Sequence, residues 1–168
     1  MNPVLTSHSQ TPALDAASRC PIVELRQYTL YPDRRDELIA LFDREFIETQ
    51  ESAGMKVLGQ FRDLADADRF VWLRGFASMA ARARALESFY DGAAWKAHRS
   101  AANATMIDSD DVLLLRPVNA HAQMPIEYWQ RESPAPPAGV LLAVVCELTA
   151  APSEAFAEIL SLDRKSVV

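Results

Sequence analysis

Residues 22–32 of the chain read IVELRQYTLYP. Within this stretch Val23 and Leu25 alternate with polar side chains, which is the period of two expected of a β-strand with two different faces. Pro32 ends the strand, because proline has no N–H to donate to a neighbouring strand. The stretch therefore predicts a strand over residues 22–30.

The segment that follows, residues 34–52, predicts a helix. Its apolar side chains recur at three- and four-residue spacing and so form one stripe along the helix. Asp33 is the expected N-cap, and Gly54 is the expected end, because glycine tolerates the left-handed turn after a helix. The stripe consists of Leu38, Leu41, Phe42 and Phe46.

Two strands come next, over residues 56–63 and 69–76. The short acidic turn at residues 65–68 between them predicts an antiparallel hairpin.

The rest of this region predicts a second helical part and a last strand. A helix is expected from the N-cap Ser78 to the break at Asp91-Gly92, and further helix over residues 94–106. Residues 112–116 predict a final strand, closed by Pro117. The side chains expected to point inward from the second helix are Met79, Leu86 and Phe89.

The order strand, helix, strand, strand, helix, strand over residues 21–118 predicts an α+β domain with the ferredoxin-like β-α-β-β-α-β fold. In such a fold the helices cover only one face of the sheet, so the other face needs a cover. A second copy of the chain is the expected cover, which makes the chain a predicted homodimer.

Several motifs in this region resemble the NIPSNAP family. They read ELRQYTLYP at residues 24–32, AGMKVLGQFRD at 53–63, FVWLRGF at 70–76, and WKAHR, AN and VLLLRP between 95 and 117. The resemblance implies the fold of the dimeric α/β barrels, in which two ferredoxin-like sheets pack face to face. It implies a homodimer, and it assigns no catalytic residue to this chain.

Composition narrows the function classes. The chain has 168 residues, 49% of them hydrophobic, and a formal net charge of -6. This acidic balance argues against a nucleic-acid partner, which requires a basic face. The longest apolar run, residues 140–146, is too short to span a membrane, and residues 1–20 read as a flexible tail without the apolar core of a signal peptide. With Cys20 and Cys146 as its cysteines, the chain is expected to be cytoplasmic, with both thiols reduced.

The second half predicts a boundary and the start of another unit. Residues 119–139 form a Pro-rich linker. Residues 140–162 repeat the pattern of the first strand, its proline and the first helix, which predicts a truncated second domain of the same kind. Residues 163–168 (DRKSVV) match the in-frame translation of a common sequencing adapter, so they are expected to be non-native. The alternative is an ordinary basic helix end.

One constellation of polar side chains is a candidate site. If the polar faces of the strands coincide, they form a pocket with arginines, a carboxylate, a phenol and an indole. Arginine forks bind carboxylates or phosphates, and aromatic walls suit a small organic body. The candidate residues are Glu24, Arg26, Tyr28, Arg62, Trp72, Arg74 and His98.

This constellation leaves alternatives open. It predicts a pocket for a small anionic molecule or a salt-bridged dimer interface, of which the sequence favours the interface. An enzyme of the dimeric barrel group, such as a cofactor-free monooxygenase or an isomerase, and a non-enzymatic scaffold are the other readings. His98 has no partners at metal-ligand spacing, so neither a metal nor a cofactor is predicted. The arginines at 82, 84 and 99 read as a solvated helix face.

Overall fold

The computed structural model describes residues 20–118, 139–156 and 158. Four strands and three helical regions lie in the first of these ranges. The strands are β1 (Ile22–Leu30), β2 (Lys56–Arg62), β3 (Arg69–Phe76) and β4 (Met106–Leu115). The first helical region comprises α1 (Arg35–Leu41), the π-helical segment η2 (Phe42–Phe46) and α2 (Ile47–Ser52), and it is followed by α3 (Met79–Tyr90) and α4 (Ala93–Asn103).

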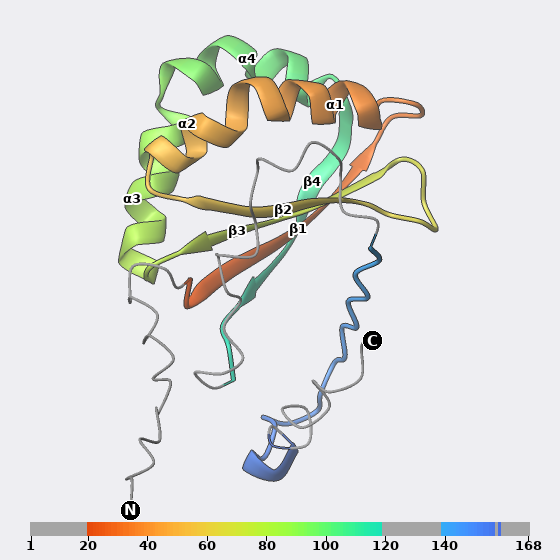
Figure 1. The fold of residues 1–168 in the computed structure, drawn as a ribbon, viewed down its shortest axis with the longest axis vertical. Coiled ribbons are helices and arrows are strands. Elements are labelled where there is room, and N and C mark those ends of the chain that lie inside the picture. The colour runs from red at the N-terminus through yellow and green to blue at the C-terminus, as the bar shows by residue number, and fades with distance from the viewer. Residues whose placement is uncertain (1–19, 119–138, 157, 159–168) are drawn as a thin grey trace, which may run out of the picture.

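The strands form one antiparallel sheet in the order β2-β3-β1-β4. This order, with the helices placed after β1 and after β3, is the ferredoxin-like arrangement, so the predicted fold is confirmed. Helices α1 to α4, with η2 between α1 and α2, lie on one side of the sheet, as Figure 1 shows. The molecule therefore has a helix-covered face and an open face.

Side chains of both layers meet in one core between the sheet and the helices. Phe42 lies with its ring centroid 4.7 Å from that of Trp72, and Phe46 lies 5.8 Å from Phe89. The predicted stripe of the first helix is thus confirmed, since all four of its members are buried against the sheet.

Of the two predicted ends of the first helix, the C-terminal one is confirmed and the N-terminal one is wrong. Gly54 has a φ of 96°, the left-handed conformation that terminates a helix. Asp33 was the expected N-cap, but the capping position belongs to Arg34 and no side chain caps this helix. Asp33 instead adopts a φ of 64°, and its N–H donates to the Asp68 carboxylate at 2.9 Å.

In the second helical region the predicted N-cap is confirmed, but one of the side chains predicted to point inward is exposed. Ser78 is the N-cap, because its Oγ accepts a hydrogen bond from the Ala81 N–H at 3.1 Å. Phe89 is buried as predicted, but Met79 is 48% exposed, because it lies at the first position of α3, at the end of the sheet.

Strand β4 begins at Met106, six residues before the predicted start at 112. The additional residues, IDSDD at 107–111, lack apolar alternation because β4 is an edge strand. Their pairing with β1 carries register shifts near Gln27 and Thr29. A polar edge strand leaves no period-two signal, so the sequence pattern could not predict its first half.

The open face carries a second, smaller apolar cluster. It alternates along β1 with the side chains that face the helices, which places it on the opposite side of the sheet. Cys20 belongs to this cluster and approaches β3 so closely that a Cβ at Gly75 would lie 2.4 Å from its Sγ. The buried members are Cys20, Val23, Leu58 and Leu73, with Leu25 and Phe61 packed against them.

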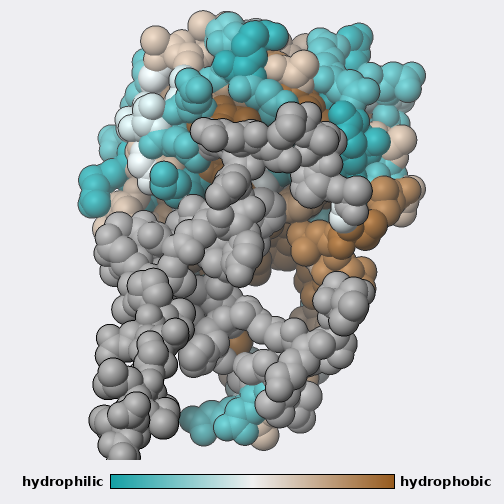
Figure 2. All heavy atoms as spheres, in the orientation of Figure 1, coloured by the Kyte–Doolittle hydropathy of each residue, from teal (hydrophilic) through white to brown (hydrophobic). Residues whose placement is uncertain are grey.

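Residues 140–148 pair with no described strand, and residues 154–156 are helical. This segment is strongly apolar and exposed, with Val140 79% and Leu142 83% accessible. Figure 2 shows brown, hydrophobic residues where this segment lies. The repeated second unit stays a prediction, and residues 1–19, 119–138 and 159–168 lie outside the described ranges. No helix in the described part of the chain is long and apolar enough to span a membrane.

Candidate functional site

The register of the sheet brings the polar side chains of three strands together. Glu24 of β1 lies opposite Arg74 of β3, and Arg26 lies opposite Trp72. Gln60 of β2 flanks Trp72 on its other side. Because facing residues of antiparallel strands point to the same side, these side chains share one face of the sheet. That face is the one beneath the helices.

A single buried carboxylate holds this group together. Glu24 Oε2 accepts from Arg74 Nε at 2.7 Å and from Arg26 Nη1 at 2.9 Å. Its other oxygen, Oε1, accepts from Arg82 Nε at 2.6 Å. Glu24, Arg26, Arg74 and Arg82 are called the charge cluster below. Three guanidinium groups minus one carboxylate leave this cluster with two excess positive charges.

The cluster is buried to different depths. Glu24 has a side-chain exposure of 0% and Arg74 of 2%, whereas Arg26 is 12% and Arg82 28% exposed. The carboxylate and one arginine are therefore sealed inside. The other two arginines form the edge of the cluster that solvent reaches, and that edge lies along α3.

Aromatic rings enclose the inner side of the cluster. The Arg26 guanidinium lies 5.5 Å from the ring centroids of Tyr28 and Trp72, and Arg74 lies 5.1 Å from that of Trp72. Arg26 Nε also donates to the Tyr28 hydroxyl at 3.0 Å. Both rings are themselves buried in the core, so they seal the inner side of the cluster from solvent.

The protonation states follow from these contacts. Burial alone would raise the pKa of Glu24, but Arg74 and Arg26 outweigh it and hold that pKa below its ordinary value. Burial raises the pKa of Tyr28, so its hydroxyl stays neutral. Near neutral pH, Glu24 is a carboxylate with both oxygens engaged, and it is not available as a general base.

Two of the predicted site residues lie elsewhere. Arg62 pairs with Asp36 of α1 at the surface. His98 of α4 lies with its Nε2 3.3 Å from an oxygen of Glu45 in η2, and its ring packs against Phe46. The sheet and helices thus unite Glu24, Arg26, Tyr28, Trp72 and Arg74, and they place Arg62 and His98 apart from them.

The favoured alternative of a dimer interface built from these polar side chains is wrong. Glu24 and Arg74 have almost no exposed surface, and an arginine from α3 contacts Glu24 from above. A second copy packing on the open face would meet the alternate side chains, which are apolar.

Sequence reasoning missed Arg82, which it assigned to a solvated helix face. The signal was present: Arg82 shares a helical stripe with Ala85 and Phe89, both buried, at spacings of three and seven residues. Gln50 was also missed, and its side-chain oxygen accepts from Arg74 Nη1 at 3.1 Å. A polar residue at the buried end of an apolar stripe points to a buried partner.

Two buried polar atoms near the cluster have no protein hydrogen-bond partner among the described residues: Trp72 Nε1 and Gln60 Oε1. Both belong to residues that face each other across β2 and β3. Buried polar groups are nearly always satisfied, so each is a place where a bound polar group would find a partner. Within the described ranges, no group of three His, Cys, Asp or Glu side chains could hold a metal ion.

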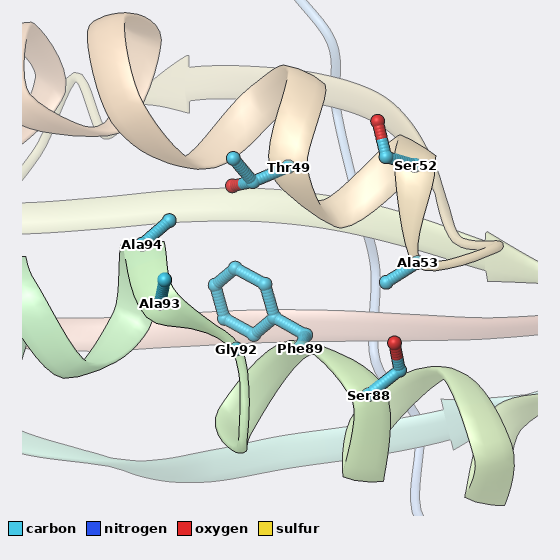
Figure 3. A pocket seen from close by; sticks show the side chains of 8 residues that line it. All are labelled: Thr49, Ser52, Ala53, Ser88, Phe89, Gly92, Ala93 and Ala94. Atoms are coloured by element: carbon cyan, nitrogen blue, oxygen red, sulfur yellow. The ribbon is translucent and has the colours of Figure 1, made fainter.

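A shallow hollow of about 250 Å³ lies on the helical layer, between α2 and the turn that joins α3 to α4. Figure 3 shows that small side chains and the ring of Phe89 line it. None of them is charged and none belongs to the charge cluster. Its lining consists of Thr49, Ser52, Ala53, Ser88, Phe89, Gly92, Ala93 and Ala94.

Solved structures with this fold come from several bacteria. An uncharacterized NIPSNAP-like domain protein from Burkholderia xenovorans is 26% identical, with a TM-score of 0.55, and the match covers 67% of this chain and 97% of that one. A NIPSNAP family protein from Agrobacterium tumefaciens is 22% identical, with a TM-score of 0.54, over 59% of this chain and 94% of that one.

The comparison of sequences points the same way. No curated protein matches the chain. The NIPSNAP family profile matches residues 23–121, which span the sheet from the second residue of β1 onward together with α1, η2, α2, α3 and α4. The chain therefore belongs to the NIPSNAP family.

Proposed function

We propose that this protein binds a small anionic molecule at the edge of the charge cluster, between the sheet and α3. The observation that carries the proposal is the excess of guanidinium groups, three around one buried carboxylate. Excess buried charge costs free energy unless it is compensated. A bound anion would provide that compensation.

The surroundings support a small organic acid as the ligand. Arginine side chains bind carboxylates through paired N–H donors. Phe76 lies 6.0 Å from the Arg82 guanidinium, and the rings of Tyr28 and Trp72 lie beside Arg26. These buried rings give the guanidinium groups an apolar surrounding, which strengthens their attraction for an anion.

Binding is favoured over catalysis by the state of the ionisable groups. Glu24 is fully engaged by arginines, and Tyr28 is held neutral by burial. Neither provides the poised base that a monooxygenase or an isomerase of the dimeric barrel group would use. The proposal is therefore a carrier or sensor of an organic anion.

Titration calorimetry of the full chain tests this function. The probes are benzoate and inorganic phosphate, with benzamide as the uncharged match for benzoate. We expect benzoate to bind and benzamide not to bind. Arg82→Gln is expected to weaken binding by about tenfold or more, because a charge-assisted hydrogen bond contributes about 1.5–3 kcal/mol.

Arg84→Gln is the matched control, since Arg84 lies exposed on the same helix. It should leave the affinity for benzoate unchanged. If neither benzoate nor phosphate binds, or if both arginine variants weaken binding equally, the charge cluster is not an anion site.

We also propose that a second copy of the chain covers the open face of the sheet. The apolar cluster there supports this, as does the resemblance to the dimeric α/β barrels. Leu25→Glu should convert the protein to a monomer in native mass spectrometry. Leu64→Glu, at a position 82% exposed between β2 and β3, should not change the subunit count. A monomeric unmodified chain would refute the dimer.

A further inference from the structure

The three arginines of the charge cluster hold Glu24 in different ways. Arg26 and Arg74 reach Oε2 from the sheet itself, at 2.9 and 2.7 Å. Arg82 reaches the other oxygen, Oε1, from α3, with Nε at 2.6 Å and Nη2 at 2.5 Å. The carboxylate is thus shared between an inner pair on the sheet and one outer arginine on a helix.

The inner pair has additional partners. Arg26 donates to the Tyr28 hydroxyl and, at 3.4 Å, to the Ser109 carbonyl. Arg74 donates to the Gln50 side chain at 3.1 Å. In the described part of the chain, Glu24 is the one hydrogen-bond acceptor of the Arg82 guanidinium group. Arg82 is therefore the member that can change its partner with the least loss of other contacts.

Release of Arg82 would not leave Glu24 unpaired. Its Oε2 would keep two guanidinium donors, so a carboxylate at 0% exposure would remain compensated. Arg82 is also the most exposed of the three arginines, at 28%. An anion from solvent thus meets Arg82 first, and the cost of breaking the Arg82–Glu24 contact is limited.

We infer that the ligand's carboxylate binds to Arg82 in place of Glu24, so that Glu24 is an internal competitor for the ligand. The inference rests on the proposed function and adds the identity of the exchanging group. Nε and Nη2 of Arg82 converge on the single oxygen Oε1 of Glu24, and after the exchange the same two donors would pair with the two oxygens of the ligand's carboxylate. The ligand class is consequently an organic carboxylate that approaches Arg82 from its solvent-exposed side.

The exchange predicts an increase in affinity when the competitor is removed. If the ligand binds only those molecules in which Arg82 is free, its apparent Kd equals the intrinsic Kd divided by the fraction of such molecules. Glu24→Gln should therefore bind benzoate about tenfold more tightly than the wild-type chain, if Arg82 is free in roughly one molecule in ten. Benzoate should also raise the Tm of this variant more than that of the wild type.

Glu24→Asp serves as the second variant, because Glu24→Gln removes the one carboxylate of the charge cluster and destabilises the folded chain. It keeps the charge on β1 and shortens the side chain by one methylene, which draws the carboxylate away from Arg82. Its affinity for benzoate should also rise above the wild-type value. Glu45→Gln, at a carboxylate that contacts His98 and Arg44 instead, is the matched control and should not change the affinity.

A measurement on the unmodified chain completes the test. In ¹⁵N NMR spectra, benzoate should shift the Nε–H signal of Arg82 and leave that of Arg74 in place. If the wild type binds benzoate but both Glu24 variants bind it no more tightly, the exchange is overturned and the proposed function stands. If benzoate and phosphate fail to bind to the wild type and to both variants, the proposed function itself fails.

Discussion

The two faces of the sheet carry different kinds of side chain. The face beneath the helices holds charged and aromatic side chains, with Glu24 at 0% and Arg74 at 1% exposure. The open face holds an apolar cluster that includes Val23 and Leu73. The same strands supply both sets from alternating positions. The proposed anion site belongs to the first of these faces, and the proposed covering copy belongs to the second.

The largest expected effect concerns the charged face. Glu24→Gln removes the carboxylate that compensates three arginines, and we expect a loss of about 3–5 kcal/mol in the free energy of unfolding, as for other broken buried ion pairs. Urea unfolding in buffer without organic acids measures it. Asp36→Asn is the control, because the Asp36–Arg62 pair is exposed and should cost about 1 kcal/mol or less. Equal losses in both variants would contradict the difference between the buried and the exposed pair.

The second prediction concerns the open face. Gly75→Ala places a Cβ 2.4 Å from Cys20 Sγ and 2.5 Å from Cys20 Cβ. Overpacking of this kind costs about 1–3 kcal/mol. Adding Cys20→Gly should restore part of the loss, and a double-mutant cycle in urea measures the coupling. Strict additivity would show that Cys20 does not pack on β3.

The third prediction concerns how the stability of the protein depends on pH through Glu24, which lies on the face beneath the helices. The pKa of Glu24 is lower in the folded than in the unfolded chain, because its arginine partners outweigh its burial. Its stabilising effect is therefore complete above the unfolded pKa, near 4.5, and is lost as pH falls through the lower folded pKa. Stability measured from pH 6 down to pH 2 should fall more steeply in the wild type than in Glu24→Gln. Parallel curves would assign the acid sensitivity to other carboxylates.

The smallest effect is expected outside both faces. His98 and Glu45 form a partly exposed pair at 3.3 Å on the helical layer. His98→Gln should change the free energy of unfolding by about 0.5 kcal/mol or less at pH 7. It should also leave benzoate binding unchanged, because His98 does not contact the charge cluster. A loss of binding in this variant would extend the site to α4.

Local sequence patterns were sufficient for most of the fold. The alternation in β1, the stripe of the first helix, Gly54 and Ser78 each depend on neighbours within a few residues, and the structure confirms them. The same local reasoning failed at the first half of β4, where the only signal is pairing with a distant strand. It also failed at Asp33, whose conformation is set by Asp68, 35 residues away.

The sequence by itself determined which side chains of each strand share a face, because a strand alternates with a period of two. Only the tertiary structure decided which face lies beneath the helices, since that depends on how the layers pack. Glu24 has guanidinium partners from β1, β3 and α3, and no spacing along the chain expresses that arrangement. The depth of the charge cluster, and the place of Arg82 in it, follow from packing alone.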